Sequence, residues 1–231
     1  VIKRRDPERV VVPFWLLPYG ISRMLAGMND RGDGSVGSTF AAAIRTYGHL
    51  NADDTGDQLM LPPYEVDDGV SWGKDAELNW SQGRKIPKKH LDFARPHLVK
   101  STAKCRTTDD VRDALLSYYP VLHASSWGGM MAPPVKGVGA NARLLNRRAT
   151  TWHHQMSCHG WEDHPEHGEI FYIMNQWGRD VHGICPSGAP PGGFWIKARD
   201  MRDIVDHGET FALSELDGFP ALTAPLDFSA F

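Results

Sequence analysis

Histidine, asparagine and hydroxyl side chains lie at positions from which a nucleophilic active site could be built. His154 precedes Asn175 by the length of a short hairpin, and Ser38 and Thr39 lie far upstream at the start of an alanine-rich run. A nucleophile needs an adjacent base, and an imidazole serves best when a third polar group orients it. His154 and Asn175 are the types that supply a base and its orienting partner. Ser38 and Thr39 carry hydroxyls that such a base could activate.

Two motifs surround these residues. The first motif reads Asn175-Gln176-Trp177-Gly178. The second motif reads Asp33-Gly34-Ser35-Val36-Gly37-Ser38-Thr39-Phe40-Ala41. They resemble the site motifs of papain-like cysteine peptidases, Asn-Ser-Trp-Gly and Gln-Gly-Ser-Cys-Gly-Ser-Cys-Trp-Ala. The resemblance covers residues 29–48 and about 117–196, and residues 49–107 match no motif.

The resemblance implies a role for each matched position around the histidine. His154, followed by Gly160-Trp161 as in the family, corresponds to the base. Asn175 corresponds to the residue that orients the imidazole, and Trp177 to the indole that shields their hydrogen bond from water. The only departure in this motif is Gln176 in place of serine.

The match breaks around the nucleophile. Thr39 stands at the position of the catalytic cysteine, Val36 at that of a disulfide partner, and Asp33 at that of the oxyanion-hole glutamine. A thiol of pKa near ~8.5 becomes a thiolate beside a helix N-terminus and an imidazolium, whereas a hydroxyl does not. A carboxylate at Asp33 would also repel a developing oxyanion. These departures predict that the fold is kept and that the peptidase chemistry is lost.

Thr39 has two interpretations. In the first, its hydroxyl caps a helix in an inactive site. In the second, Thr39 or Ser38 works with His154 and Asn175 in an active hydrolase, and a threonine nucleophile would need autocleavage before Thr39 to free an amine base. The sequence gives no sign of such cleavage. We expect the first interpretation, with His154 facing Thr39 rather than a thiolate.

A group of histidines beside Cys158 raises the alternative of a zinc site. Its members are His153, His154, His159, His164 and His167. Neighbouring residues of a strand point to opposite faces, and the last two histidines fall in an expected turn, so four ligands do not converge. We therefore expect no metal and no cofactor. Cys158 and Cys185 are expected to be buried as small apolar side chains.

Composition excludes several classes of protein. The 231 residues suffice for a substantial core, and three cysteines allow at most one disulfide. This favours a reducing compartment, such as a host cytoplasm or an assembled virion. A net charge of -3 with mixed signs predicts no nucleic-acid binding. The longest apolar stretch, Val10 to Ile21, contains two prolines and is shorter than the roughly 20 residues of a membrane span, so we expect a soluble protein.

Periodicity places these residues on secondary-structure elements. Helices are expected over Phe40 to Tyr47, with Ser38 and Thr39 as possible N-caps, over Thr108 to Tyr118, and over Ala198 to Gly208. Strands are expected over Val121–Ala124, Trp152–Trp161, Ile170–Met174 and Phe194–Ile196. A turn over Glu162 to Gly168 would join the second and third strands into a hairpin that ends at Asn175.

Together these features predict an α+β, papain-like fold with two lobes and a cleft between them. A helical left lobe would carry the Thr39 helix, and an antiparallel β right lobe would carry His154 and Asn175. We expect a single domain over residues 1–231, with a division near 119 between a helical part (1–119) and a β-rich part (120–231).

Two functional hypotheses follow. A Gly-Asp-Gly-Ser-Val-Gly core and the segment Gly188–Trp195 resemble a divergent papain-like group in phage and bacterial genomes. The first hypothesis is an inactive peptidase homologue that binds a ligand or has a structural role in an assembly such as a phage virion. It predicts other protein chains as partners, through an exposed apolar surface over Val10 to Leu17. The second hypothesis is the hydrolase described above.

Overall fold

The computed structural model describes residues 13–29, 34–51, 86–186 and 188–216. Asp33 lies outside the described residues, as does the segment 52–85, which is most of the region that matches no motif. The elements of the first half of the chain are β1 (Pro13–Phe14), α2 (Leu16–Leu25), α3 (Gly37–Thr46), β2 (Leu50–Asn51), α6 (Lys88–Ala94), β3 (Val99–Lys104) and α7 (Thr108–Leu116). Those of the second half are β4 (Val121–Ser125), β5 (Val135–Lys136), β6 (Arg143–Leu144), β7 (His154–His164), β8 (Gly168–Met174), β9 (Gly193–Lys197), α8 (Ala198–Asp206) and β10 (Thr210–Leu216).

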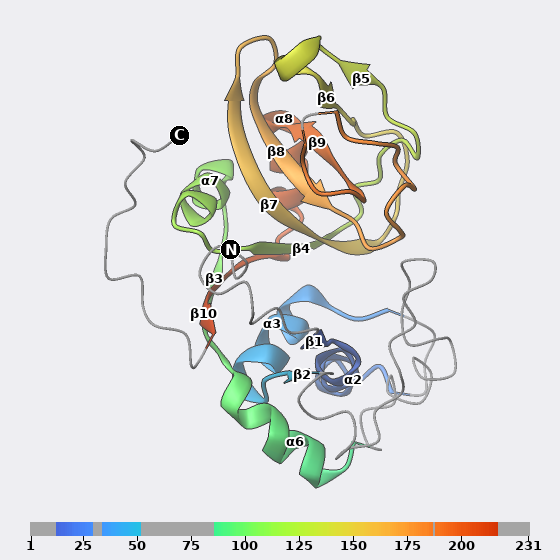
Figure 1. Ribbon diagram of the computed structural model, residues 1–231. Helices are drawn as coiled ribbons and strands as arrows, with labels where there is room; N and C mark the ends of the chain where they lie inside the picture. Colours follow the sequence, from blue (N-terminus) through green and yellow to red (C-terminus); the bar gives the residue numbers. More distant parts are fainter. Residues whose placement is uncertain (1–12, 30–33, 52–85, 187, 217–231) are drawn as a thin grey trace.

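An antiparallel sheet of six strands extends from the upper part of the molecule, where β7, β8 and β9 lie, to the middle left, where β3 and β10 lie (Figure 1). Its order is β3-β10-β4-β7-β8-β9. The expected hairpin is confirmed as β7–β8, although β7 continues to His164 and leaves a shorter turn than expected. A bulge between Cys158 and Gly160 shifts the register of this pair. Two long strands joined by a short turn place the start of β7 beside the end of β8, where His154 and Asn175 lie.

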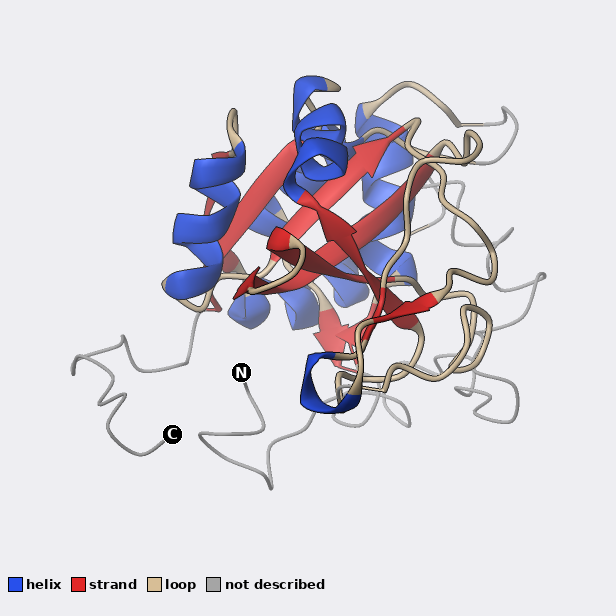
Figure 2. Ribbon diagram, turned by 90° about the horizontal axis from the view of Figure 1, so that it is seen from above, coloured by secondary structure: helices blue, strands red, loops and turns tan. Residues whose placement is uncertain are grey.

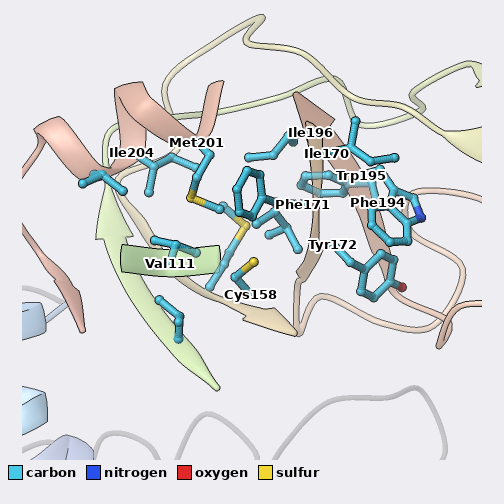
Figure 3. Close-up of a cluster of buried hydrophobic side chains, with 14 of the residues drawn as sticks. Val111, Cys158, Ile170, Phe171, Tyr172, Phe194, Trp195, Ile196, Met201 and Ile204 are labelled. Carbon is cyan, nitrogen blue, oxygen red and sulfur yellow. The ribbon is translucent and has the colours of Figure 1, made fainter. Parts of the chain in front are cut away.

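The main hydrophobic core is built around this sheet. Burial alternates along β4, so that Val121 faces the core, and Ile170, Phe171 and Ile173 of β8 are fully buried. Helix α8 presents Met201 and Ile204 to the same core, as Figure 3 shows. Each buried side chain of this size contributes roughly 1.5–3 kcal/mol relative to exposure.

Helix α7 packs on the sheet rather than on the other N-terminal helices. Its first turn is fixed by a capping box in which Thr107 accepts from the Asp110 N–H and Asp110 accepts from the Thr107 N–H. Val111 and Ala114 then join the sheet core. Helix α7, which precedes residue 119, thus packs on strands that follow it.

A second, smaller core lies in the lower part of Figure 1. It joins α2 and α3 to residues around them, namely Phe14, Leu16, Leu17, Ile21, Ala43, Leu50 and Ala94. Phe14, Leu16 and Leu17 are 0% exposed, so the expected exposed apolar surface over Val10 to Leu17 is wrong for these residues. Packing against Ala43 and Leu50 removes them from water. Residues 10–12 lie outside the described part of the chain.

Helix α3 connects the two cores. It packs against α2 on one side, and it contacts β3, β4 and β10 of the sheet on the other. Seen from above, the strands lie in the middle of the molecule with helices around them (Figure 2). The N-terminus of α3 is thereby held against the sheet near its central strands. No helix within the described ranges is long and apolar enough to cross a membrane.

Candidate functional site

A groove of about 840 Å³ lies between the N-terminal helices and the sheet. Its first wall consists of Trp15, Tyr19, Gly34, Ser35, Val36, Gly37 and Phe40. Its second wall consists of Leu122, Ala124, Ser125, residues 153–157 and Gln176. His207 and Glu209, which precede β10, also line it. The groove therefore contains the start of α3 and the start of β7, the two places where the sequence predicts a site.

His154 and Asn175 meet at one end of this groove. The His154 Nε2 lies 3.1 Å from the Asn175 Oδ1, and the Asn175 side chain is buried, with 3% exposure. His153, directly before His154, has φ 41°, in the left-handed region that non-glycine residues seldom adopt. The chain turns at this residue and enters β7 with His154 lining the groove.

Trp177 covers the histidine as the resemblance implies. Its ring stacks on the His154 ring with centroids 4.7 Å apart and planes at 28°. Trp152 packs edge-on against Trp177 at 4.9 Å. Aromatic surface on this side keeps water from the hydrogen bond between His154 and Asn175 and strengthens it.

The surroundings of His154 favour its neutral form. Burial is the largest influence and lowers the pKa of His154, while hydrogen bonds with Asn175 and Gln176 act in the opposite direction. Gln176, the departure from the family motif, also donates to the Gln155 carbonyl at 3.3 Å. A neutral imidazole can accept a proton or a hydrogen bond, but it provides no positive charge to stabilise an anion.

Thr39 does not line the groove, and its described side-chain contacts do not include His154. Its Oγ1 donates to the Val36 carbonyl at 2.8 Å and lies 2.9 Å from the Ser22 Oγ of α2. The expectation that His154 faces Thr39 is therefore not met by the contacts. Helix α3 begins at Gly37, earlier than the expected start at Phe40. Thr39 is therefore its third residue, and the Thr39 hydroxyl donates to the Val36 carbonyl one turn before it.

Ser22 ties together the hydroxyls at the start of α3. Its side chain is fully buried and contacts both the Ser35 Oγ and the Thr39 Oγ1. Ser22 and Thr39 both lie within reach of the Val36 carbonyl, at 3.4 and 2.8 Å, so the hydroxyls and this carbonyl form one network. At the helix start the groove is lined by Ser35, whose hydroxyl contacts Ser22, and by Val36, which is 37% exposed and cannot act as a nucleophile.

Glu209 is the residue that sequence reasoning missed. Its carboxylate accepts a hydrogen bond from the Ser38 backbone N–H at 2.5 Å, at the first turn of α3. This close approach needs Gly37, because a Cβ there would lie 3.0 Å from the Glu209 Oε2 and 3.1 Å from the Ala124 Cβ. Glu209 is 171 positions from Ser38 in the chain, and no local pattern marks it.

The other histidines and the cysteines lie in separate local surroundings. Among the described residues, no group of three His, Cys, Asp or Glu side chains could hold a metal ion. The His164 Nε2 hydrogen-bonds to the Asn141 carbonyl, and the His164 Nδ1 accepts from the Glu166 N–H. Cys105, Cys158 and Cys185 are all buried, and burial raises the pKa of Cys105 to about 11.

Comparison by sequence finds no relative: no family model matches, and no curated protein matches. The structure, by contrast, is similar to solved cysteine proteases. It aligns with xylellain, a cysteine protease from Xylella fastidiosa, with a TM-score of 0.56 and 15% identity over 92% of this chain and 72% of that one. Two proforms are also similar. The Amb a 11 cysteine protease, a major ragweed pollen allergen, gives a TM-score of 0.51 and 12% identity over 92% of this chain and 54% of that one.

Digestive procathepsin L 3 of the Tenebrio molitor larval midgut gives a TM-score of 0.52 and 11% identity, over 93% of this chain and 59% of that one. The chain thus spans little more than half of these two proforms. At such identities the likeness concerns the fold. The papain-like α+β fold expected from the sequence is confirmed.

Proposed function

We propose that this chain is a catalytically inactive papain-like protein that uses the groove between its lobes for binding. The observation that carries the proposal is the position of Glu209 at the N-terminus of α3. A helix N-terminus stabilises a thiolate or an oxyanion through its free N–H groups and its positive dipole end. Here a carboxylate already accepts from one of these N–H groups, and it would repel a second anion beside it.

The residues near the expected nucleophile position support the same proposal. Val36 occupies the groove at the helix start, and the hydroxyls of Ser35 and Thr39 are engaged with Ser22. Ser38 meets Glu209 through its backbone and does not line the groove. A hydroxyl needs an adjacent base to attack a carbonyl, and Thr39 is bonded elsewhere. These contacts argue against the hydrolase that uses Thr39 or Ser38 with His154 and Asn175.

The groove retains what a binding site needs. It is open to solvent, and Trp15, Tyr19 and Phe40 give it aromatic surface. His154, Gln176 and Ser125 add polar groups that can orient a ligand. The binding partner is a protein or peptide segment in this proposal, because the resemblance to phage and bacterial sequences suggests a structural part of an assembly such as a virion.

Two measurements test the proposal. The purified protein is expected to show no labelling by an irreversible thiol-directed peptidase inhibitor and no turnover of a broad peptide library. Turnover that His154→Ala abolishes would establish the hydrolase instead. For binding, a peptide selected from that library should lose affinity when Ala124→Trp fills the groove, whereas Val138→Trp, at an 81% exposed position outside the groove lining, should leave affinity unchanged. Equal affinity for both variants would place binding elsewhere.

A further inference from the structure

A second histidine lies behind Asn175. The His182 ring is 1% exposed and lies with its Nε2 2.9 Å from the Asn175 Nδ2 and its Nδ1 3.0 Å from the Met131 carbonyl oxygen. Trp152 stacks on this ring at 5.8 Å, and Phe194 meets it edge-on at 4.7 Å. Four contacts on different sides hold the ring in one orientation, so its two nitrogens cannot exchange places without repacking the core.

The Met131 carbonyl determines which nitrogens are protonated along the series of contacts from His182 through Asn175 to His154. A carbonyl oxygen only accepts, so the His182 Nδ1 carries the proton and donates to it. Burial lowers the pKa of His182, which favours a neutral ring, and the Nε2 of a neutral ring with a proton on Nδ1 is an acceptor. That acceptor requires the Asn175 NH₂ group opposite it. The Asn175 amide therefore turns its Oδ1 toward His154.

The Asn175 amide in turn determines where His154 carries its proton. Because the Asn175 Oδ1 accepts, the His154 Nε2 must carry the proton in the 3.1 Å hydrogen bond between them. In a neutral His154 the Nδ1 then holds a lone pair. The ring lines the groove, and its Nε2 side is taken by Asn175. The Gln176 side chain also interacts with the ring and lines the groove, so a ligand would meet the Nδ1 beside Gln176.

We propose that His182 is a positioning residue that sets the tautomer of His154 by fixing the amide of Asn175. The groove then presents a hydrogen-bond acceptor at the His154 Nδ1. One consequence of this assignment rests on the proposed function: the ligand bound in the groove offers an N–H or O–H donor to the His154 Nδ1. The backbone of an extended peptide provides such donors. Without His182, the Asn175 amide can turn over and offer its NH₂ group to His154, and the His154 proton then moves to Nδ1.

Long-range ¹H–¹⁵N NMR spectra of the ligand-free protein test the inference, since they distinguish protonated from unprotonated imidazole nitrogens. The His154 signals are assigned by their loss in His154→Gln. We expect the wild type to hold the form with the proton on Nε2 by about tenfold or more, because the other form leaves two buried acceptors facing each other. His182→Phe keeps a ring of similar size and should reduce this excess to a mixture.

His182→Gln is the matched variant, since its side-chain oxygen can accept from the Asn175 NH₂ group, and it should keep the wild-type form. Backbone amide spectra confirm that both variants are folded. A wild-type His154 protonated on Nδ1, or an unchanged tautomer in folded His182→Phe, would overturn the inference. Neither result depends on a ligand. Peptide turnover would overturn the proposed function alone, and the tautomer assignment would stand.

Discussion

Glu209 and Ser38 are joined by a hydrogen bond that closes the N-terminus of α3: the Ser38 N–H donates to the Glu209 carboxylate at 2.5 Å. The acceptor comes from the turn before β10 and the donor from the helix that carries the nucleophile in the peptidases this fold resembles. The contact therefore ties the last strand of the sheet to the helix start. It also places a negative charge where peptidase chemistry would need to form one.

Glu209→Gln should lower the free energy of unfolding by about 0.5–1 kcal/mol, because the amide keeps the acceptor but loses the favourable interaction of a negative charge with the helix N-terminus. Glu209→Ala should lower it by about 1–2 kcal/mol, because the Ser38 N–H then loses its partner. Urea unfolding measures both. Glu166→Gln, at an exposed turn position, is the control and should change little; an effect of Glu209→Gln no larger than this would count against the contact.

Cysteine substitutions can establish which residue at the start of α3 faces the groove. Val36→Cys should react with iodoacetamide about tenfold faster than Thr39→Cys, because Val36 lines the groove and Thr39 contacts Ser22. Peptide mass spectrometry measures the rates. The native thiols provide a slow background, since burial raises the pKa of Cys105 to about 11 and also raises that of Cys158.

The same substitution tests the electrostatic effect of Glu209. In the double variant Val36→Cys with Glu209→Gln, the thiol at position 36 should have a lower pKa and react faster at neutral pH than in Val36→Cys alone. The pH dependence of the labelling rate gives this pKa. Identical profiles for the single and double variants would mean that Glu209 does not influence the helix start.

Ser22→Ala should destabilise the fold by about 1–2 kcal/mol, because the buried hydroxyl links Ser35 and Thr39 to α2 and its loss leaves their hydrogen bonds incomplete. Chemical unfolding provides the measurement. Ser117→Ala, at an exposed position after α7, serves as the matched control and should stay within about 0.5 kcal/mol of the wild type. A Ser22→Ala variant as stable as this control would show that the hydroxyl network contributes little to the free energy of unfolding.

The free energy of unfolding should decrease as the pH is lowered, because of His123. Its ring is 1% exposed, both ring nitrogens lack a hydrogen-bond partner among the described residues, and burial, followed by the proximity of His154, lowers its pKa from 6.5 to about 3. The unfolded chain therefore binds a proton below about pH 6.5 that the folded protein does not bind until about pH 3. The free energy of unfolding decreases as pH falls across this window, by up to about 1.4 kcal/mol per unit.

His123→Leu should flatten this dependence, as unfolding at a series of pH values would reveal. His207→Gln replaces an exposed histidine and should keep the wild-type slope. A His123→Leu slope equal to that of His207→Gln would mean that His123 is protonated in the folded state near its ordinary pKa.

Much of the secondary structure could be predicted because its causes are local. The apolar spacing from Ala198 predicts α8, and the branched and aromatic residues from Ile170 predict β8. Asn175 at the end of a hairpin was predictable for the same reason. The start of α3 was not, because both Gly37 and Thr39 are compatible with a first turn, and packing against Ala124 and Glu209 selects the earlier start.

The sequence by itself determined the papain-like fold, the pairing of His154 with Asn175 and the absence of a cysteine at the expected nucleophile position, because motif, periodicity and residue identity lie in short segments. The tertiary structure decided which atoms surround those residues. Glu209, Ser22 and His182 act through contacts that depend on how the lobes, strands and loops pack, and no local signal marks them. These contacts turn Thr39 toward α2, place a carboxylate at the start of α3, and fix the Asn175 amide beside the His154 ring.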